Sequence, residues 1–147
     1  MFFVKTKSDD NLPEEARSIV EALKNSQSKG ECLYKAYNFL SKKYQGTIKN
    51  NIINFFDLFL NENEVWHKKL LSCNTLNYLL KKILVGSKIF KLEEIESKWT
   101  FLWYFSPHQY LKIKMDDLKT TKIDLWAASR GIEFGDYAHG FHLKTKE

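Results

Sequence analysis

Three residues of the chain, Cys73, His108 and Asp124, have the types and the order of a thiol-based catalytic triad. A thiolate attacks a carbonyl carbon, an imidazole carries the proton to the leaving group, and a carboxylate orients the imidazole and supports its positive charge. The order is therefore typical of acyl transfer at an amide. That chemistry requires a fold that brings the three side chains together.

Cys73 stands where a helix is expected to begin. Ser72 is a suitable N-cap, apolar residues recur at helical spacing from Leu76 to Ile83, and Gly86 supplies a stop. In the first turn of a helix, unpaired backbone N–H groups and the positive end of the dipole favour the nucleophilic thiolate. The alternative is a small buried cysteine without chemistry, and only partners elsewhere in the chain decide between the two.

His108 and Asp124 are expected on two neighbouring strands of a hairpin. Alternation places His108 and Tyr110 on one face of the first strand, and residues 122–126 form the return strand after a turn at Asp116 and Asp117. If the hairpin loop has an odd number of residues, Asp124 lies on the face of His108. A loop of even length would place them on opposite faces.

Helical patterns precede the cysteine. They cover a helix starting at the cap residue Asn11 with Pro13 in its first turn, a second over residues 31–44 and a third over residues 52–60. Cys32 opens the second helix, but no acid–base partners are ordered around it, so we interpret it as structural. After a polar break at residues 61–64, residues 65–71 lead into the cysteine and are expected to form a pocket wall.

Beyond Gly86 the chain becomes rich in aromatic and β-branched residues. Residues 89–92 and 99–105 are expected to be strands, with the stretch between them ambiguous, and the tail from residue 127 to 147 is expected to be a loop-rich wrap. No linker or repeat divides the chain. We therefore predict one α+β domain over residues 1–147, with N-terminal helices and the cysteine helix packed on an antiparallel sheet.

The motifs around the three residues resemble the transglutaminase-like superfamily, a branch of the papain-like fold. That family has a helix-opening cysteine, then a strand beginning His-x-Tyr/Trp, then a strand ending in Ile/Val-Asp. This chain has Ser72-Cys73-Asn74-Thr75, then His108-Gln109-Tyr110, then Ile123-Asp124. The resemblance covers about residues 31–137, which leaves residues 1–30 as an N-terminal helical extension. It implies Cys73 as nucleophile, His108 as general base and acid, and Asp124 as orienter.

The residues before the cysteine depart from the family pattern. Many relatives have Gly-x-Cys, whereas this chain has Leu71-Ser72-Cys73, so the shape of the oxyanion hole differs. The backbone N–H of Cys73 is one candidate donor to it. The weaker candidates for a substrate and oxyanion pocket are Trp66, Ser72, Tyr110 and Trp126. For Trp66 the simpler interpretation is a plain core or pocket-wall residue, and for His67 it is a surface histidine.

Composition narrows the classes of partner. With a net charge of +5 the chain is basic, but its only arginines are Arg17 and Arg130, which argues against nucleic-acid recognition. His139 and His142 with Asp136 lack a third ligand at useful spacing, so no metal and no cofactor are expected. We expect no membrane segment and no signal peptide, and two cysteines suit a reducing, cytoplasmic compartment.

The leading functional hypothesis is a cysteine-dependent peptidase, amidase or transglutaminase that acts on a peptide or protein substrate. A rival of another class is a non-catalytic binding module of the same fold, in which Trp99, Trp103, Tyr104 and Tyr110 form the partner surface. A third possibility is a secreted effector that modifies host proteins. Substrate, oligomeric state and the choice between hydrolysis and transfer stay open.

Overall fold

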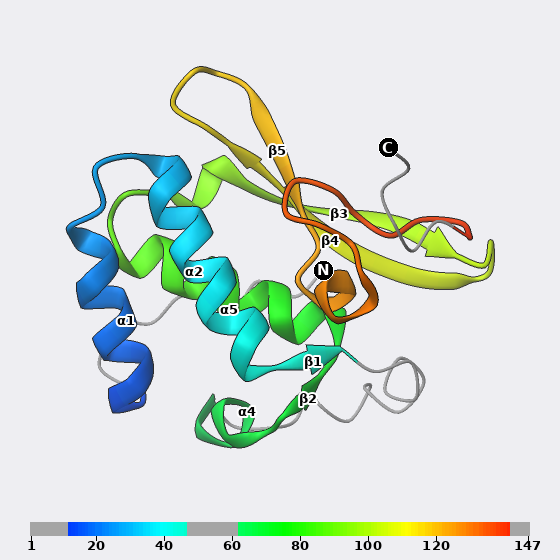
Figure 1. The fold of residues 1–147 in the computed structure, drawn as a ribbon, viewed down its shortest axis with the longest axis horizontal. Helices are drawn as coiled ribbons and strands as arrows, with labels where there is room; N and C mark the ends of the chain where they lie inside the picture. Colours follow the sequence, from blue (N-terminus) through cyan, green and yellow to red (C-terminus); the bar gives the residue numbers. More distant parts are fainter. Residues whose placement is uncertain (1–11, 47–61, 142–147) are drawn as a thin grey trace.

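Helices pack on one side of a three-stranded antiparallel sheet in the computed structural model, which describes residues 12–46 and 62–141 (Figure 1). The fold is thus α+β. The helices are α1 (Glu14–Lys24), α2 (Lys29–Lys43), α4 (Glu62–His67) and α5 (Cys73–Gly86), with short 3₁₀ helices η3 (Leu92–Glu94) and η4 (Trp126–Arg130). The strands are β1 (Gln45–Gly46), β2 (Leu70–Leu71), β3 (Ile95–Leu102), β4 (Ser106–Lys114) and β5 (Thr120–Ile123).

Three of the expected helices are confirmed in the described residues. Helix α1 follows Pro13 and buries Ala16, Val20 and Leu23, which are the expected apolar stripe. Asn11, its expected cap, lies outside the described residues, as does the expected helix over residues 52–60. Apolar residues spaced for one helix face are buried because α1 packs against both α2 and α5.

Helices α2 and α5 form the centre of the core. Both begin at a serine N-cap: Ser28 accepts from the Glu31 backbone N–H, and Ser72 accepts from the Thr75 backbone N–H. Leu33 and Leu40 of α2 and the leucines of α5 are fully buried, and the two helices pack against each other. Helix α5 also packs on β4, as expected for the cysteine helix.

The sheet has the order β3-β4-β5, with β4 in the centre. Strand β4 pairs with β3 from Ser106 to Ile113, but with β5 only from Leu111 to Lys114. Alternation along β4 puts Gln109, Leu111 and Ile113 on one face, where Gln109 contacts Asn77 of α5, and His108 and Tyr110 on the opposite face. The segment after η4 covers this opposite face, because Tyr137 stacks on Tyr110 with ring centroids 4.1 Å apart (Figure 1).

Several expected boundaries are wrong. Residues 89–92 are not a strand; they include a bend and the start of η3, and Phe90 is buried without strand pairing. The expected polar break over residues 61–64 instead contains the start of α4. Strand β3 ends at Leu102 rather than at residue 105, because Trp103 and Tyr104 turn the chain with positive φ angles of 49° and 62°.

None of the helices in the described parts of the chain has both the length and the apolar character needed to cross a bilayer.

Candidate active site

Cys73 is the first residue of α5, and two local devices hold it there. The Ser72 side chain caps the helix by accepting the Thr75 backbone N–H at 3.2 Å. Just before the cap, β2 pairs in parallel with β1, through Gln45 with Leu70 and Gly46 with Leu71. The chain therefore passes from the paired strand β2 through Ser72 directly into α5, which begins at Cys73. Its side chain is nearly closed off from solvent, at 5% exposure.

His108 and Asp124 form a buried pair. The His108 Nε2 and the Asp124 Oδ2 lie 2.6 Å apart, and neither side chain is exposed to solvent. A hydrogen bond this short between a buried imidazole and a carboxylate is of the charge-assisted kind. Of the three residues predicted for the triad, the structure brings these two into direct contact.

The carboxylate of Asp124 also organises the chain that follows it. Its Oδ1 accepts the Ala127 backbone N–H at 3.1 Å, and its Oδ2 accepts the Ala138 backbone N–H at 2.9 Å. The first of these bonds joins Asp124 to the start of η4 and the second joins it to the tail. Because three donors converge on one carboxylate, its position is fixed.

The return strand ends earlier than the sequence predicts. The prediction is residues 122–126, but β5 ends at Ile123, because Asp124 accepts the Ala127 N–H and the chain turns into η4. Of the two loop lengths that the sequence leaves open, the structure has the odd one. Leu111 pairs with Ile123 and Lys114 with Thr120, so the loop 115–119 has an odd number of residues. This register places Asp124 on the face of His108.

Trp126 closes this face of the pair. Its ring lies 4.9 Å from the His108 ring, at an angle of 53°, and the Arg130 guanidinium lies 4.5 Å above the Trp126 ring. Trp126 is only 1% exposed. The histidine is therefore enclosed between its carboxylate partner and an aromatic cover, and water has little access to it.

The environment of His108 favours its positive form. Burial favours the neutral ring, but the hydrogen bonds and charges of Asp124 and Cys73 favour the imidazolium more strongly, so the pKa of His108 rises from 6.5 to about 9. His108 is then protonated at neutral pH.

The remaining ring nitrogen is the one available to the thiol. His108 Nδ1 is buried and has no hydrogen-bond partner among the described residues, whereas the Cys73 thiol donates to the Asn74 side-chain oxygen at 3.7 Å. Cys73 contributes to the raised pKa of His108, after Asp124. Since Nε2 is taken by Asp124, Nδ1 is left for Sγ. Catalytic hydrogen bonds are often long before substrate binds.

The four weaker pocket candidates are placed differently. Trp126 contacts His108, as described above, and Ser72 is engaged as the helix cap, with its hydroxyl 2.8 Å from the Thr75 hydroxyl. Tyr110 stacks on Tyr137 on the face of His108. Trp66 is a buried residue of α4, and its indole Nε1 has no acceptor among the described residues.

Asn77 was not predicted as part of the site. It lies one helical turn after Cys73, is 2% exposed, and donates from Nδ2 to the Gln109 backbone carbonyl at 3.0 Å and to the Gln109 side chain at 3.2 Å. Its signal in the sequence is a polar residue four positions after the cysteine, on the face that also carries the buried Leu80 and Leu84.

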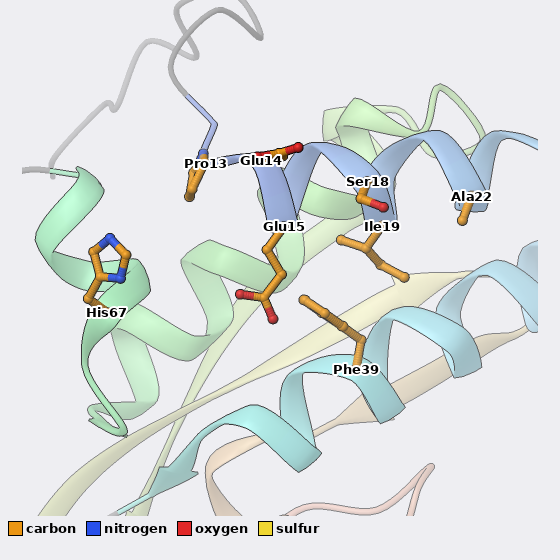
Figure 2. A pocket seen from close by; sticks show the side chains of 8 residues that line it. All are labelled: Pro13, Glu14, Glu15, Ser18, Ile19, Ala22, Phe39 and His67. Atoms are coloured by element: carbon orange, nitrogen blue, oxygen red, sulfur yellow. The ribbon is translucent and has the colours of Figure 1, made fainter.

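A groove of about 670 Å³ lies elsewhere, between α1, α2 and α4 (Figure 2). The side chains of Glu15, Ile19 and Phe39 point into it, and His67 stands at one end, exposed as expected for a surface histidine. Its lining includes no residue of the predicted triad. This groove and the three residues of the predicted triad therefore lie in different parts of the molecule.

Among the described residues, no group of three or more His, Cys, Asp or Glu side chains is arranged to hold a metal ion. Of the residues considered for a metal, His142 lies outside the described part of the chain. Cys32 and Cys73 are both free thiols.

Comparison of the chain with models of known families, with curated proteins and with solved structures finds no match.

Proposed function

We propose that this protein is a cysteine-dependent acyl-transfer enzyme of the transglutaminase-like type, acting on amides of peptides or proteins. Cys73 is the nucleophile, His108 the general acid and base, and Asp124 the orienter. The observation that carries the proposal is the buried 2.6 Å bond between His108 and Asp124, in a histidine whose pKa is raised to about 9 partly by Cys73.

In the first half of the reaction the Cys73 thiolate attacks the amide carbonyl carbon. The C–N bond then breaks, the His108 imidazolium gives its proton to the departing nitrogen, and a thioester on Cys73 remains. Asp124 keeps the ring oriented and supports its charge before the transfer. The buried bond to Asp124 suits this role because the low local dielectric strengthens it.

In the second half water or an amine attacks the thioester. Neutral His108 accepts the proton of the attacking group, the C–S bond breaks, and the Cys73 thiolate returns beside the imidazolium. Water gives hydrolysis and an amine gives transfer. The same three side chains serve both outcomes, so the choice depends on which acceptor reaches the thioester.

The start of α5 supplies donors for the oxyanion of the tetrahedral intermediate. The first four N–H groups of a helix have no partner within the helix. The Ser72 hydroxyl accepts the Thr75 N–H, and the Ser72 carbonyl accepts the Leu76 N–H. Neither of these cap bonds uses the N–H of Cys73. This N–H lies on the residue that attacks, which is the geometry an oxyanion hole needs.

We further propose a cytoplasmic place of action and a polypeptide substrate, with no cofactor. The support for the compartment is that both cysteines are free thiols, as in reducing environments.

The test is alkylation by iodoacetamide at about pH 6, followed separately at Cys73 and Cys32 by mass spectrometry of their peptides. We expect Cys73 to react roughly tenfold faster than a free thiol. His108→Ala removes this advantage, whereas His67→Ala, which changes an exposed histidine six residues before Cys73, leaves it. Buried Cys32 serves as a control for unfolding within the same molecule. A Cys73 rate equal to that of a free thiol and unchanged in His108→Ala would contradict the proposal.

One observation favours the rival function, a non-catalytic binding module. Cys73 is 5% and His108 0% exposed, so a substrate reaches them only when the surrounding residues move apart. Meanwhile two residues of the expected partner surface are exposed: Trp99, within β3, at 59% and Tyr104, in the turn between β3 and β4, at 75%. If alkylation fails as above while Trp99→Ala abolishes capture of a partner protein, the binding module is the better account.

A further inference from the structure

Asn77 is a polar side chain in an apolar environment, one turn from the proposed nucleophile. It is 2% exposed, and its neighbours in sequence on the buried side of α5 are Leu76 and Leu80. Residues four apart on a helix share a face, and their Cα atoms are about 6 Å apart along the axis. Cys73 and Asn77 therefore lie one above the other on α5.

The amide of Asn77 connects α5 to β4. Its Nδ2 donates to the backbone carbonyl of Gln109 at 3.0 Å and to the side-chain oxygen of the same residue at 3.2 Å. The backbone oxygen accepts only, so the orientation of the Asn77 amide follows from its partner. Gln109 directly follows His108. One buried side chain thus joins the helix of the nucleophile to the strand of the general base.

The end of β5 explains why Gln109 has a carbonyl available. Going back along β4, pairing with β5 stops at Leu111, which pairs with Ile123. Gln109, two residues before Leu111, therefore has no partner on β5. A buried carbonyl without a donor destabilises the fold. Asn77 supplies the donor that the strand does not, and it does so beside the proposed site.

We propose that Asn77 is a positioning residue that sets the distance between the Cys73 thiol and the His108 ring. The inference rests on the proposed function. Asn77 touches no reacting atom, and it acts by holding the first turn of α5 on β4 at Gln109. Without its two bonds the start of α5 moves relative to β4, and His108 stabilises the thiolate less.

The experiment measures the iodoacetamide alkylation rate of Cys73 at about pH 6 and about pH 9 and takes the ratio, since access to the thiol affects both rates alike. Asn77→Leu keeps the branched shape and removes both donors. We expect its ratio to fall roughly tenfold, because small displacements within a catalytic group are costly. Gln109→Met, which keeps the backbone acceptor and removes the side-chain acceptor, gives a smaller fall. If Asn77→Leu does not fold, Gln109→Met decides alone.

The matched control is Ile83→Val, a buried change on α5 away from its first turn. It weakens the helix packing and leaves the ratio unchanged. A normal ratio in the folded Asn77 and Gln109 variants, with His108→Ala still lowering it, would overturn the positioning role alone. A wild-type ratio equal to that of a free thiol, unaffected by His108→Ala, would overturn the proposed function and this inference with it.

Discussion

The two cysteines of this protein stand at the starts of two serine-capped helices, yet their surroundings differ. Ser28 caps α2 and Ser72 caps α5, and both Cys32 and Cys73 are buried. Burial raises the pKa of Cys32, whose Sγ lies 3.5 Å from the Ser87 hydroxyl. The Cys73 thiol instead donates to the Asn74 side-chain oxygen at 3.7 Å and raises the pKa of His108, a histidine paired with a carboxylate.

The difference shows what a helix start does and does not supply. Both thiols have a capped helix terminus, but the charges near Cys32, Glu31 and Lys35, act on it in opposite directions, whereas Cys73 interacts with a histidine that has its own carboxylate partner. A neutral hydroxyl such as Ser87 accommodates a neutral thiol. We infer that the partner, rather than the helix terminus, separates a structural cysteine from a candidate nucleophile.

The largest effect on stability is expected from removing the Asp124 carboxylate, which pairs with His108. Asp124→Ala leaves a buried imidazolium without its counter-ion and two backbone N–H groups without an acceptor. We expect the free energy of unfolding to fall by about 3–5 kcal/mol. Beside Cys32, we expect Ser87→Ala to lower the free energy of unfolding by about 1–2 kcal/mol. Urea denaturation measures both, and equal losses would break the comparison.

The second prediction concerns the pH dependence of stability. The pKa of His108 is raised to about 9 in the folded protein, so its contribution is complete below the unfolded value of 6.5 and is lost as pH rises through 9. Over this window we expect the free energy of unfolding to fall by on the order of 3 kcal/mol. In His108→Gln the slope between pH 6.5 and 9 disappears. A wild-type stability that is flat or rises over this window would contradict the raised pKa.

The smallest effects are expected at the two caps. Ser72→Ala and Ser28→Ala each remove one side-chain bond to a backbone N–H and each cost about 1 kcal/mol. Only Ser72→Ala slows alkylation of Cys73, since it loosens the turn that carries the thiol. Thermal denaturation and labelling of the same samples measure both properties. A comparable loss of labelling in Ser28→Ala would assign the effect to general destabilisation.

Local sequence signals predicted the elements that carry the three residues. The cap at Ser72 and the leucine spacing after it define α5, and the alternation around His108 defines the face on which Asp124 lies once the loop length is known. These features depend on residues close together in sequence, where capping and side-chain alternation are reliable guides.

Other features depend on contacts or turns without a local signal. Trp103 and Tyr104 turn the chain with positive φ, where glycine or asparagine is usual, so the end of β3 was missed. Ile89 and Phe90 form a short apolar run that is buried without strand pairing. The cover over His108 comes from Trp126 and the tail, and it arises from packing between segments distant in sequence.

The central claim is that His108 is coupled both to Asp124 and to Cys73, and titration of the His108 ring by NMR tests it most directly. We expect a pKa of about 9 in the wild type. Cys73→Ala lowers this pKa, and Asp124→Asn lowers it further, because Asp124 contributes more. A wild-type pKa at or below the ordinary value of 6.5, or one that does not change in Cys73→Ala, would contradict the account.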